Sequence, residues 1–277
     1  MTVTRTIADC RAERLRLGKV ALVPTMGALH AGHLSLIAEA KKHAPKVAVS
    51  IFVNPTQFGP KEDFNKYPRP IESDLQKCQE AGVDLIFNPS VEEMYPPGTV
   101  ETVIDFPSLT TILEGRHRPG HFRGVCLVVA KLFNIFAPEA ALFGRKDFQQ
   151  LRVISAMAQS LNFPTEVVGC PTIREADGLA MSSRNQYLSA EDRKRALALS
   201  RGLFTAAEQL KAGYRQANRL TTTMQRILLE QHVLLDYVAA VDPITLKEID
   251  VIEGPTVLAV AARVGNTRLI DNITVTP

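Results

Sequence analysis

Residues 47–53, with the sequence Val-Ala-Val-Ser-Ile-Phe-Val, constrain the fold of this chain more than any other segment. The run is almost continuously apolar, whereas a strand with one face in water alternates apolar and polar residues. We therefore expect a strand buried on both faces, as in a parallel sheet. A shorter apolar run at 20–23 and a helical pattern at 34–43 come before it. Strand, helix and strand in this order form the repeating unit of α/β proteins.

The same alternation continues through residues 1–172. We expect further helices at 74–81, 124–136 and 147–161, strands at 83–87, 140–143 and 166–168, and another extended piece at 102–106. This order predicts an α/β fold in which residues 1–172 form a Rossmann-like domain with a doubly wound parallel sheet.

The character of the sequence changes after residue 172. Ser189 precedes a long helical pattern that reaches residue 211, and a second helical pattern follows. The later elements are a helix at 217–230 and extended runs at 235–241, 256–262 and 269–273. We therefore expect residues 173–277 to form a smaller α+β domain with an antiparallel sheet. Its first residues, 173–183, would connect the two domains.

Charge and hydropathy argue against several classes of protein. The formal net charge is +3 and the basic residues are dispersed, which is unlike a nucleic-acid-binding stripe or a polybasic membrane tail. No apolar stretch reaches the length of about 18 residues that a membrane span needs. The first residues also lack the apolar core of a signal peptide. We expect neither a nucleic acid nor a membrane as a partner.

The cysteines indicate a reducing compartment. Cys10, Cys78, Cys126 and Cys170 lie far apart, and no Cys-x-x-Cys pair is present. This spacing gives no support to a zinc ribbon or a thioredoxin-type redox site. Free thiols are the usual state in the cytosol, so we expect a cytoplasmic protein.

Residues 25–33 carry the first motif with a chemical meaning. They read Thr-Met-Gly-Ala-Leu-His-Ala-Gly-His and connect an expected strand to an expected helix. The first N–H groups of a helix lack partners and bind phosphate well. Gly27 and Gly32 would let a ligand approach the backbone, and His30 and His33 add imidazole donors. The His-x-x-His spacing around a glycine is typical of nucleotidylyl-transferring enzymes, which act on the α-phosphate of ATP.

Further segments carry side chains suited to nucleotides and carboxylates. They are 52–59 (Phe-Val-Asn-Pro-Thr-Gln-Phe-Gly), 115–124, 143–150 (Phe-Gly-Arg-Lys-Asp-Phe-Gln-Gln) and 181–184 (Met-Ser-Ser-Arg). Gln57 follows a buried strand, at the edge of the sheet where such folds bind ligands. Lys146 is suited to phosphate charge, Asp147 to ribose hydroxyls and Arg184 to a triphosphate. Each of these residues alone would more often be a turn or capping residue.

Two charged clusters leave alternatives open. Asp74, with Glu72 nearby, would suit a magnesium ion, but charges at the start of a helix are more often solvated. Segment 115–124 contains three arginines and two histidines. It is either a solvated loop or a flap above anionic substrates.

Taken together, these motifs closely resemble those of the pantothenate synthetase (pantoate–β-alanine ligase) family. The most specific match combines Pro-Thr-Met-Gly-Ala-Leu-His-x-Gly-His with Ala-Asp-Gly-Leu-Ala-Met-Ser-Ser-Arg-Asn. Matching segments extend from residue 24 to residue 188, and the C-terminal part matches mainly in character. One departure is Arg145, where many members have Glu.

The resemblance implies a two-step reaction. The carboxylate of (R)-pantoate attacks the α-phosphate of ATP, which gives pantoyl adenylate and pyrophosphate. The amine of β-alanine then attacks the adenylate, which gives pantothenate and AMP. The resemblance also implies Mg²⁺, a homodimer and a C-terminal domain that acts as a lid.

The family pattern assigns expected roles to individual residues. The catalytic residues are His33, as the proton donor, with His30, Lys146 and Arg184. Gln57 and Gln150 are expected to bind pantoate, and Gln57 also β-alanine. The expected ATP-binding residues are Met26, Gly27, Ala28, Leu29, His30, Ala31, Gly32, His33, Gly144, Arg145, Lys146, Asp147, Ile173, Met181, Ser182, Ser183 and Arg184. For Mg²⁺ we expect the phosphates and water as main ligands, with no assigned protein ligand.

Two other functions stay open at this point. A different nucleotidylyltransferase would share the histidine turn but would release an adenylylated product, and it would not explain Gln57 and Gln150. A catalytically silent nucleotide-binding module would bind ATP without turnover.

Overall fold

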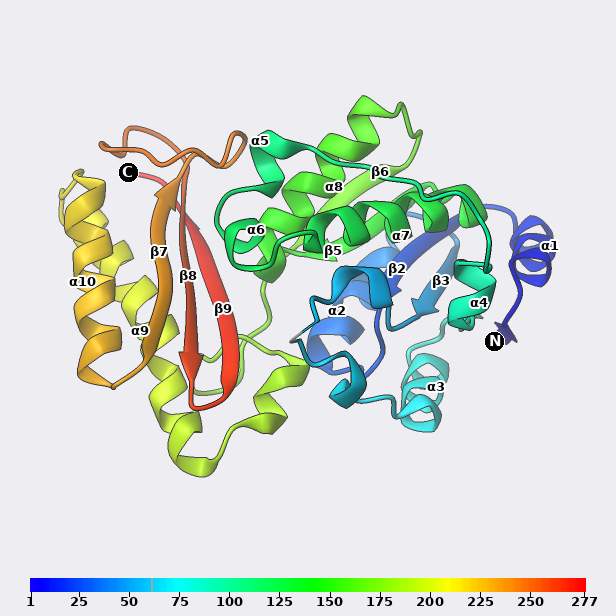
Figure 1. The fold of residues 1–277 in the computed structure, drawn as a ribbon, viewed down its shortest axis with the longest axis horizontal. Helices are drawn as coiled ribbons and strands as arrows, with labels where there is room; N and C mark the ends of the chain where they lie inside the picture. Colours follow the sequence, from blue (N-terminus) through cyan, green and yellow to red (C-terminus); the bar gives the residue numbers. More distant parts are fainter. Residues whose placement is uncertain (61) are drawn as a thin grey trace.

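Two sheets organise the molecule (Figure 1). The structure is a computed structural model that describes residues 1–60 and 62–277. A six-stranded parallel sheet lies in the first part of the chain, and a three-stranded antiparallel sheet lies near its end. The α/β fold class predicted from the sequence is therefore confirmed.

The parallel sheet has the strand order β1-β4-β3-β2-β5-β6. Its strands are β1 (Thr2–Thr4), β2 (Val20–Thr25), β3 (Lys46–Ile51), β4 (Leu85–Phe87), β5 (Ala140–Gly144) and β6 (Glu166–Cys170). From β2 the chain adds β3 and β4 on one side. It then crosses back over the sheet and adds β5 and β6 on the other side of β2. Open α/β sheets bind ligands at the carboxyl ends of the strands beside such a switch point.

Alternate residues of the central strands pack against helices on opposite faces. In β2, Val20 and Leu22 belong to one core cluster, whereas Ala21 and Val23 belong to another. The first cluster includes residues of α1 (Ile7–Leu17), α7 (His121–Phe136) and α8 (Phe148–Ser160), and the second includes residues of α2 (Ala31–Ala40) and α3 (Ile71–Glu80). Burial on both faces explains why these strands are continuously apolar in the sequence.

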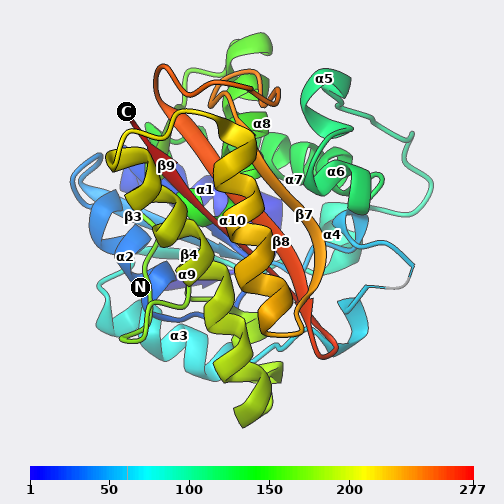
Figure 2. The ribbon, with the colours of Figure 1, turned by 90° about the vertical axis from the view of Figure 1, so that its left-hand side faces the viewer.

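The antiparallel sheet is covered by helices on one face and by the rest of the molecule on the other. It consists of β7 (Leu234–Val241), β8 (Thr256–Val264) and β9 (Thr267–Val275), with α9 (Ala190–Lys211) and α10 (Ala217–Glu230) over its outer face (Figure 2). Residues of its inner face, such as Val241 and Val257, share a core cluster with α7. The two sheets are therefore joined by apolar packing.

The connections hold the remaining short helices. These are η1 (Pro55–Gln57), η2 (Phe64–Lys66), α4 (Val91–Met94), α5 (Pro107–Thr110), α6 (Glu114–His117), η3 (Arg145–Asp147) and η4 (Ser183–Tyr187). The extended piece predicted at 102–106 does not form a strand of either sheet. Its apolar residues Ile104 and Phe106 pack against the core instead of a neighbouring strand. Strand β1 and helix α1 had not been predicted.

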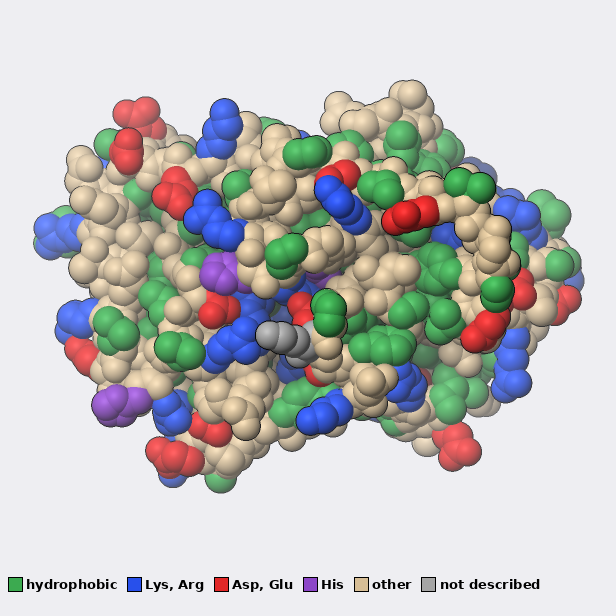
Figure 3. Space-filling model, in the orientation of Figure 1, with side chains coloured by type: hydrophobic (Ala, Val, Ile, Leu, Met, Phe, Trp, Pro, Cys, Tyr) green, Lys and Arg blue, Asp and Glu red, His purple; other side chains and the backbone are tan. Residues whose placement is uncertain are grey.

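The cysteines, the apolar helices and the surface charges can be compared with what the composition predicts. All four cysteines are buried with free thiols, and burial raises the pKa of Cys10 and Cys78 to about 11. None of the described helices combines the length and the apolar character needed to cross a lipid bilayer. Side chains of both charges are mixed over the face drawn in Figure 3.

A buried histidine fastens η1 to the first turn of α7. His121 is 8% exposed, and its Nδ1 lies 2.8 Å from the carbonyl oxygen of Gln57. Its Nε2 lies 3.0 Å from Nη1 of Arg118, which also forms an ion pair with Glu62. Because arginine can only donate, Nε2 accepts and Nδ1–H donates to Gln57. Gly124 allows this close packing, since a Cβ there would lie 2.3 Å from the carbonyl oxygen of Thr56.

We predict that acid destabilises the protein partly through this histidine. Burial, and then the charge of Arg118, lower the pKa of His121 to about 4. An unfolded histidine titrates near 6.5, so below that pH the unfolded chain takes up a proton that the folded chain does not. The free energy of unfolding should fall by about 2 kcal/mol on this account between pH 7 and pH 5.

Urea unfolding of wild type and His121→Asn at both pH values measures this effect. The asparagine keeps an N–H donor for Gln57 but does not titrate, so its loss of stability should be smaller by about 2 kcal/mol. Equal losses in the two proteins would rule out His121 as the source.

Candidate active site

A cavity opens at the carboxyl ends of β2, β3 and β5, beside the switch point of the sheet. Many of the residues predicted from the motifs line it: Met26, His30, Gly32, His33, Gln57, Gly144, Lys146, Asp147, Gln150, Ile173, Met181, Ser182, Ser183 and Arg184. Gly27, Ala28, Leu29, Ala31 and Arg145 were predicted with them but are not part of the wall. The fold therefore brings together segments that lie far apart in the sequence.

The backbone after β2 follows a left-handed path that one carboxylate holds in place. Gly27 has φ 83° and Ala28 has φ 52°. The carboxylate of Asp74, on α3, accepts hydrogen bonds from the N–H groups of Ala28 at 2.7 Å and Leu29 at 2.8 Å. Nζ of Lys77 donates to the carbonyl of Leu29 at 2.8 Å. A Cβ at Gly27 would lie 2.9 Å from Asp74, so glycine is needed there for space as well as for φ.

Asp74 is 1% exposed, so the interpretation of this residue as a solvated charge at a helix start is wrong. Both of its oxygens accept backbone hydrogen bonds. Its local sequence, Glu-Ser-Asp at the start of α3, is common and gave no signal of this contact. The contact joins residues 45 or 46 positions apart, which a local pattern does not reveal.

The two histidines of the turn hold each other at the start of α2. Nδ1 of His30 accepts the N–H of Gly32 at 3.1 Å, and Nδ1 of His33 accepts the N–H of His30 at 3.3 Å. Their ring centroids are 4.2 Å apart. An imidazole nitrogen that accepts a hydrogen bond carries no proton, so each neutral ring has its proton on Nε2.

Both histidines are neutral at physiological pH. Burial, and then the neighbouring His30, lower the pKa of His33 to about 3. Burial is also the main reason that the pKa of His30 is lowered, followed by the charge of Lys146. In this state the pair supplies N–H donors rather than positive charge.

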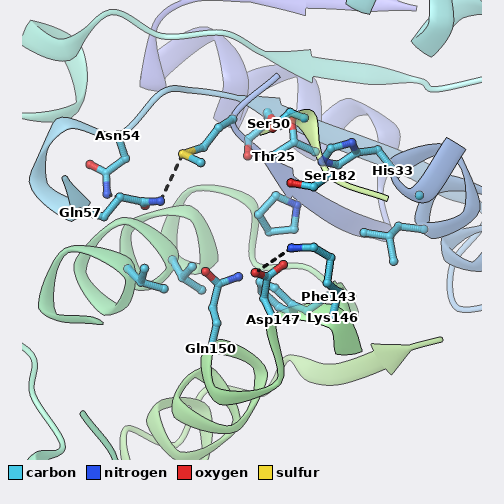
Figure 4. Close-up of a pocket in the computed structure, with 18 of the residues that line it drawn as sticks. Thr25, His33, Ser50, Asn54, Gln57, Phe143, Lys146, Asp147, Gln150 and Ser182 are labelled. Carbon is cyan, nitrogen blue, oxygen red and sulfur yellow. Dashed lines mark hydrogen bonds and ion pairs between the residues drawn. The ribbon is translucent and has the colours of Figure 1, made fainter. Parts of the chain in front are cut away.

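The amide of Gln57 is oriented by buried neighbours at the end of β3. Its Oε1 accepts a hydrogen bond from Nδ2 of Asn54 at 3.0 Å, and its Nε2 donates to the sulfur of Met26 at 3.1 Å. Asn54 is itself held by Tyr95, whose hydroxyl donates to its Oδ1 at 2.8 Å. This arrangement turns the N–H₂ group of Gln57 toward the cavity (Figure 4). Asn54 lines the same cavity, although sequence reasoning did not select it.

Neighbouring glutamines on α8 have different surroundings. The buried Gln149 donates to the carbonyls of Leu109 and Ile112 and accepts from the N–H of Glu114. The next residue, Gln150, points into the cavity from another side than Gln57 (Figure 4). The amides of Gln57 and Gln150 therefore face a common space.

The segment after β5 supplies charge to the wall. Nζ of Lys146 lies 3.5 Å from the carboxylate of Asp147, and both line the cavity. Arg145 turns away from it, with Nε donating to the carbonyl of Gly169 at 3.1 Å. Its backbone lies in the segment predicted to bind ATP, but its side chain belongs to the sheet edge.

Segment 181–184 closes another side of the cavity. The guanidinium of Arg184 forms two hydrogen bonds, of 2.9 and 3.0 Å, with the carboxylate of Asp63. The hydroxyl of Tyr67 lies 3.3 Å from that of Ser183. The N–H of Met181 donates to the carbonyl of Ile173 at 3.0 Å, which joins the two ends of this stretch. Tyr67 was a second residue that sequence reasoning missed.

Segment 115–124 is partly packed and partly exposed. Gly115, His121, Phe122 and Gly124 are buried, and Arg118 and His121 line the cavity. The segment is therefore only partly solvated: its buried residues belong to α6 and the first turn of α7, whereas Arg116, His117, Pro119, Gly120 and Arg123 are exposed. Its basic residues are only partly directed at the cavity.

The described part of the cavity wall also contains an unpaired hydroxyl group and few carboxylates that could bind a metal ion. Ser50, at the end of β3, lines the cavity, and its Oγ has no hydrogen-bond partner among the described residues. The described residues contain no group of three or more His, Cys, Asp or Glu side chains arranged to hold a metal ion. Among the described lining residues, Asp147 is the only carboxylate.

Comparison with known proteins gives the family. The family model described as pantoate-beta-alanine ligase matches residues 2–274. The pantothenate synthetase of Thermoanaerobacter sp. (strain X514) is 51% identical over 278 residues, which cover 99% of this chain and 98% of that protein. That of Thermobifida fusca (strain YX) is 50% identical, with coverage of 99% and 95%.

Solved structures agree with this match. A crystal structure of pantothenate synthetase from Thermus thermophilus has a TM-score of 0.96 and 46% identity, with full coverage of both chains. The pantoate-beta-alanine ligase of Francisella tularensis, in complex with beta-gamma ATP and beta-alanine, has a TM-score of 0.80 and 33% identity, covering 99% of this chain and 97% of that one. This chain belongs to the pantoate–β-alanine ligase, or pantothenate synthetase, family.

Proposed function

We propose that this protein condenses (R)-pantoate with β-alanine to form pantothenate, with ATP cleaved to AMP and pyrophosphate through pantoyl adenylate. Membership of the family supports this reaction, and the ligands of the Francisella tularensis relative support ATP and β-alanine as substrates. One observation of the site carries the proposal furthest. The amides of Gln57 and Gln150 face one space beside the histidine turn, so a small acid and a nucleotide phosphate would meet there.

In the first step, the pantoate carboxylate would attack the α-phosphate of ATP. Gln57 and Gln150 would hold pantoate through their amides. The Nε2–H groups of His30 and His33 would donate to the phosphoryl oxygens as negative charge grows on them. Since both histidines are neutral, the positive charge for the phosphates would come from Lys146 and Arg184.

The remaining ATP contacts are proposed from the predicted segments. Met26, Gly32 and Gly144 would bring backbone close to the nucleotide, and Ile173 would pack near the adenine. Asp147 would accept from the ribose hydroxyls. Ser182 and Ser183 would bind the phosphates together with Arg184. Gly27, Ala28, Leu29 and Ala31 would act by shaping the turn rather than by touching the ligand.

In the second step, the amine of β-alanine would attack the carbonyl carbon of the adenylate and AMP would leave with the C–O bond electrons. The amine loses a proton as the amide forms. The adenylate must be kept from water until this attack. We propose that residues 173–277 form a separate domain that closes over residues 1–172 as a lid during this interval.

Three further features are proposed from the family resemblance. Mg²⁺ would be held mainly by ATP oxygens and water, which fits a cavity whose described lining offers a single carboxylate. Bound there, the ion would neutralise phosphate charge. The protein would be a homodimer and would be located in the cytoplasm.

Pyrophosphate release from ATP and Mg²⁺, with and without each substrate, tests the function. We expect release to depend on pantoate, and pantothenate and AMP to form only when β-alanine is added, as shown by mass spectrometry. An adenylylated final product would indicate a different nucleotidylyltransferase. ATP binding without pantoate-dependent release would indicate a silent module.

We predict that Arg184→Ala raises the KM for ATP and slows pyrophosphate release by roughly tenfold, because a planar guanidinium at a triphosphate is lost. Asp63→Asn is the matched control, since it breaks the same ion pair but leaves the guanidinium free for ATP. Its KM for ATP should equal or fall below that of wild type. If both variants weaken ATP binding equally, the ion pair rather than the phosphate contact is what matters.

We predict that Asp74→Asn reduces pantoate-dependent pyrophosphate release by roughly ten- to a hundredfold, because its NH₂ group would face one of the two backbone N–H groups instead of accepting from it, and the histidines would shift. Glu72→Gln, at the exposed start of the same helix, should leave the rate unchanged. Steady-state assays of the two variants measure the difference. A wild-type rate for Asp74→Asn would show that the turn does not depend on this carboxylate.

A further inference from the structure

Strand β9 presents two adjacent buried polar residues to the segments around the cavity. Asp271 is 2% exposed and Asn272 is 7% exposed. Neither residue lines the main cavity, although both lie beside the smaller space between the antiparallel sheet and α7 and α8. Buried polar groups are costly unless they form hydrogen bonds, so their partners indicate why they are there.

The partners of Asn272 are backbone atoms of the segment after β5. Its Nδ2 donates to the carbonyl of Arg145 at 3.0 Å and to the carbonyl of Lys146 at 2.7 Å. Both N–H bonds of the amide are used in this way. Asn272 therefore fixes the backbone from which the side chains of Lys146 and Asp147 enter the cavity wall.

The partner of Asp271 is the arginine that starts the connection to segment 181–184. Arg174 donates to the two carboxylate oxygens of Asp271 at 2.6 and 2.9 Å. The same guanidinium donates to the carbonyl of Gly178 at 3.0 Å, and Arg174 pairs with Ala180 in an antiparallel bridge. This contact holds the stretch from Ile173 to Met181, both of which line the cavity.

We propose that Asp271 and Asn272 are a pair of positioning residues that hold segments 144–147 and 173–184 at a fixed distance from each other. This inference rests on the proposed function, in which both segments contact ATP. The two residues adjoin on one strand, so the spacing of the segments follows from the strand geometry. The Nδ2 group of Asn272 and both oxygens of Asp271 are used by the protein, and neither residue lines the main cavity, so the pair acts through the segments and not on ATP directly.

Only one side of the cavity depends on this pair. Gln57 and the histidine turn are held by Asn54, His121 and Asp74, none of which contacts β9 in the hydrogen bonds described above. Loss of Asn272 should therefore disturb segment 144–147 and leave Gln57 and the histidine turn in place. A small misplacement of an ATP-binding group can lower the rate strongly.

Steady-state kinetics of Asn272→Ala and Asn272→Leu test this inference. Leucine roughly fills the space of asparagine but donates no hydrogen bond, so it separates hydrogen bonding from filling of space. We expect both variants to raise the KM for ATP by roughly tenfold and to leave the KM for β-alanine, which Gln57 is proposed to bind, unchanged. Calorimetric titration with ATP should show the same loss of affinity.

Arg152→Ala is the matched control. Nε of Arg152, on α8, donates to the carbonyl of Ile244, which follows β7, at 2.6 Å. This variant therefore also removes a contact between the part of the chain that holds the parallel sheet and the part that holds the antiparallel sheet. It should lower Tm without changing the KM for ATP. The proposal is overturned if leucine restores the wild-type KM for ATP, if both Asn272 variants bind ATP normally, or if Arg152→Ala weakens ATP binding equally.

The same measurements distinguish the failure of this inference from failure of the proposed function. If wild type shows no pantoate-dependent pyrophosphate release, the ligase function is wrong. The titrations of the variants with ATP still report whether Asn272 organises the nucleotide segments. If wild type is an active ligase and the Asn272 variants behave as wild type, only the positioning pair is wrong.

Discussion

The carboxylate of Asp74 is the interaction on which the geometry of the site depends. The chain leaves β2 through Gly27 and Ala28 in the left-handed region, which costs an alanine roughly 1 kcal/mol or more. Two hydrogen bonds from buried backbone N–H groups to Asp74 offset this cost. Helix α2 then begins at a defined point, and the rings of His30 and His33 lock each other in place from there.

The same principle recurs around the cavity. His121 holds the backbone of η1, and Gln149 holds the connection between α5 and α6. In each case a buried polar side chain binds the backbone of a different segment, while a neighbouring side chain is left to face the cavity. Gln57 and Gln150 are the side chains left in this way. Loops fixed through their backbones present a preorganised site without help from ligand.

Most helices and strands could be predicted from the sequence, but the hydrogen bonds between distant segments could not. Periodicity and capping are local properties, so the strands β2 to β6 of the parallel sheet and the helices from α7 to α10 were predicted well. Residues 102–106 have the pattern of a strand, but a strand also needs a partner, and none lies beside them among the described residues. Asp74 and Glu72 look alike in the sequence, as do Gln149 and Gln150. Only long-range packing decides which member of each pair is buried.

An arginine ion pair near the cavity connects the part of the chain that holds the parallel sheet with the C-terminal part. Because the histidines are neutral, the proposed phosphate site depends on Lys146 and Arg184 for positive charge. Arg184 is paired with Asp63, and the pKa of that carboxyl is lowered because this ion pair outweighs the effect of burial. A triphosphate would therefore have to compete with Asp63 for the guanidinium. Arg184 belongs to the segment that Arg174 connects to β9. A change of partner of Arg184 from Asp63 to a triphosphate would therefore act on the antiparallel sheet through Arg174. On the proposed function, binding of ATP would therefore be coupled to movement of the C-terminal part through Arg174 and β9.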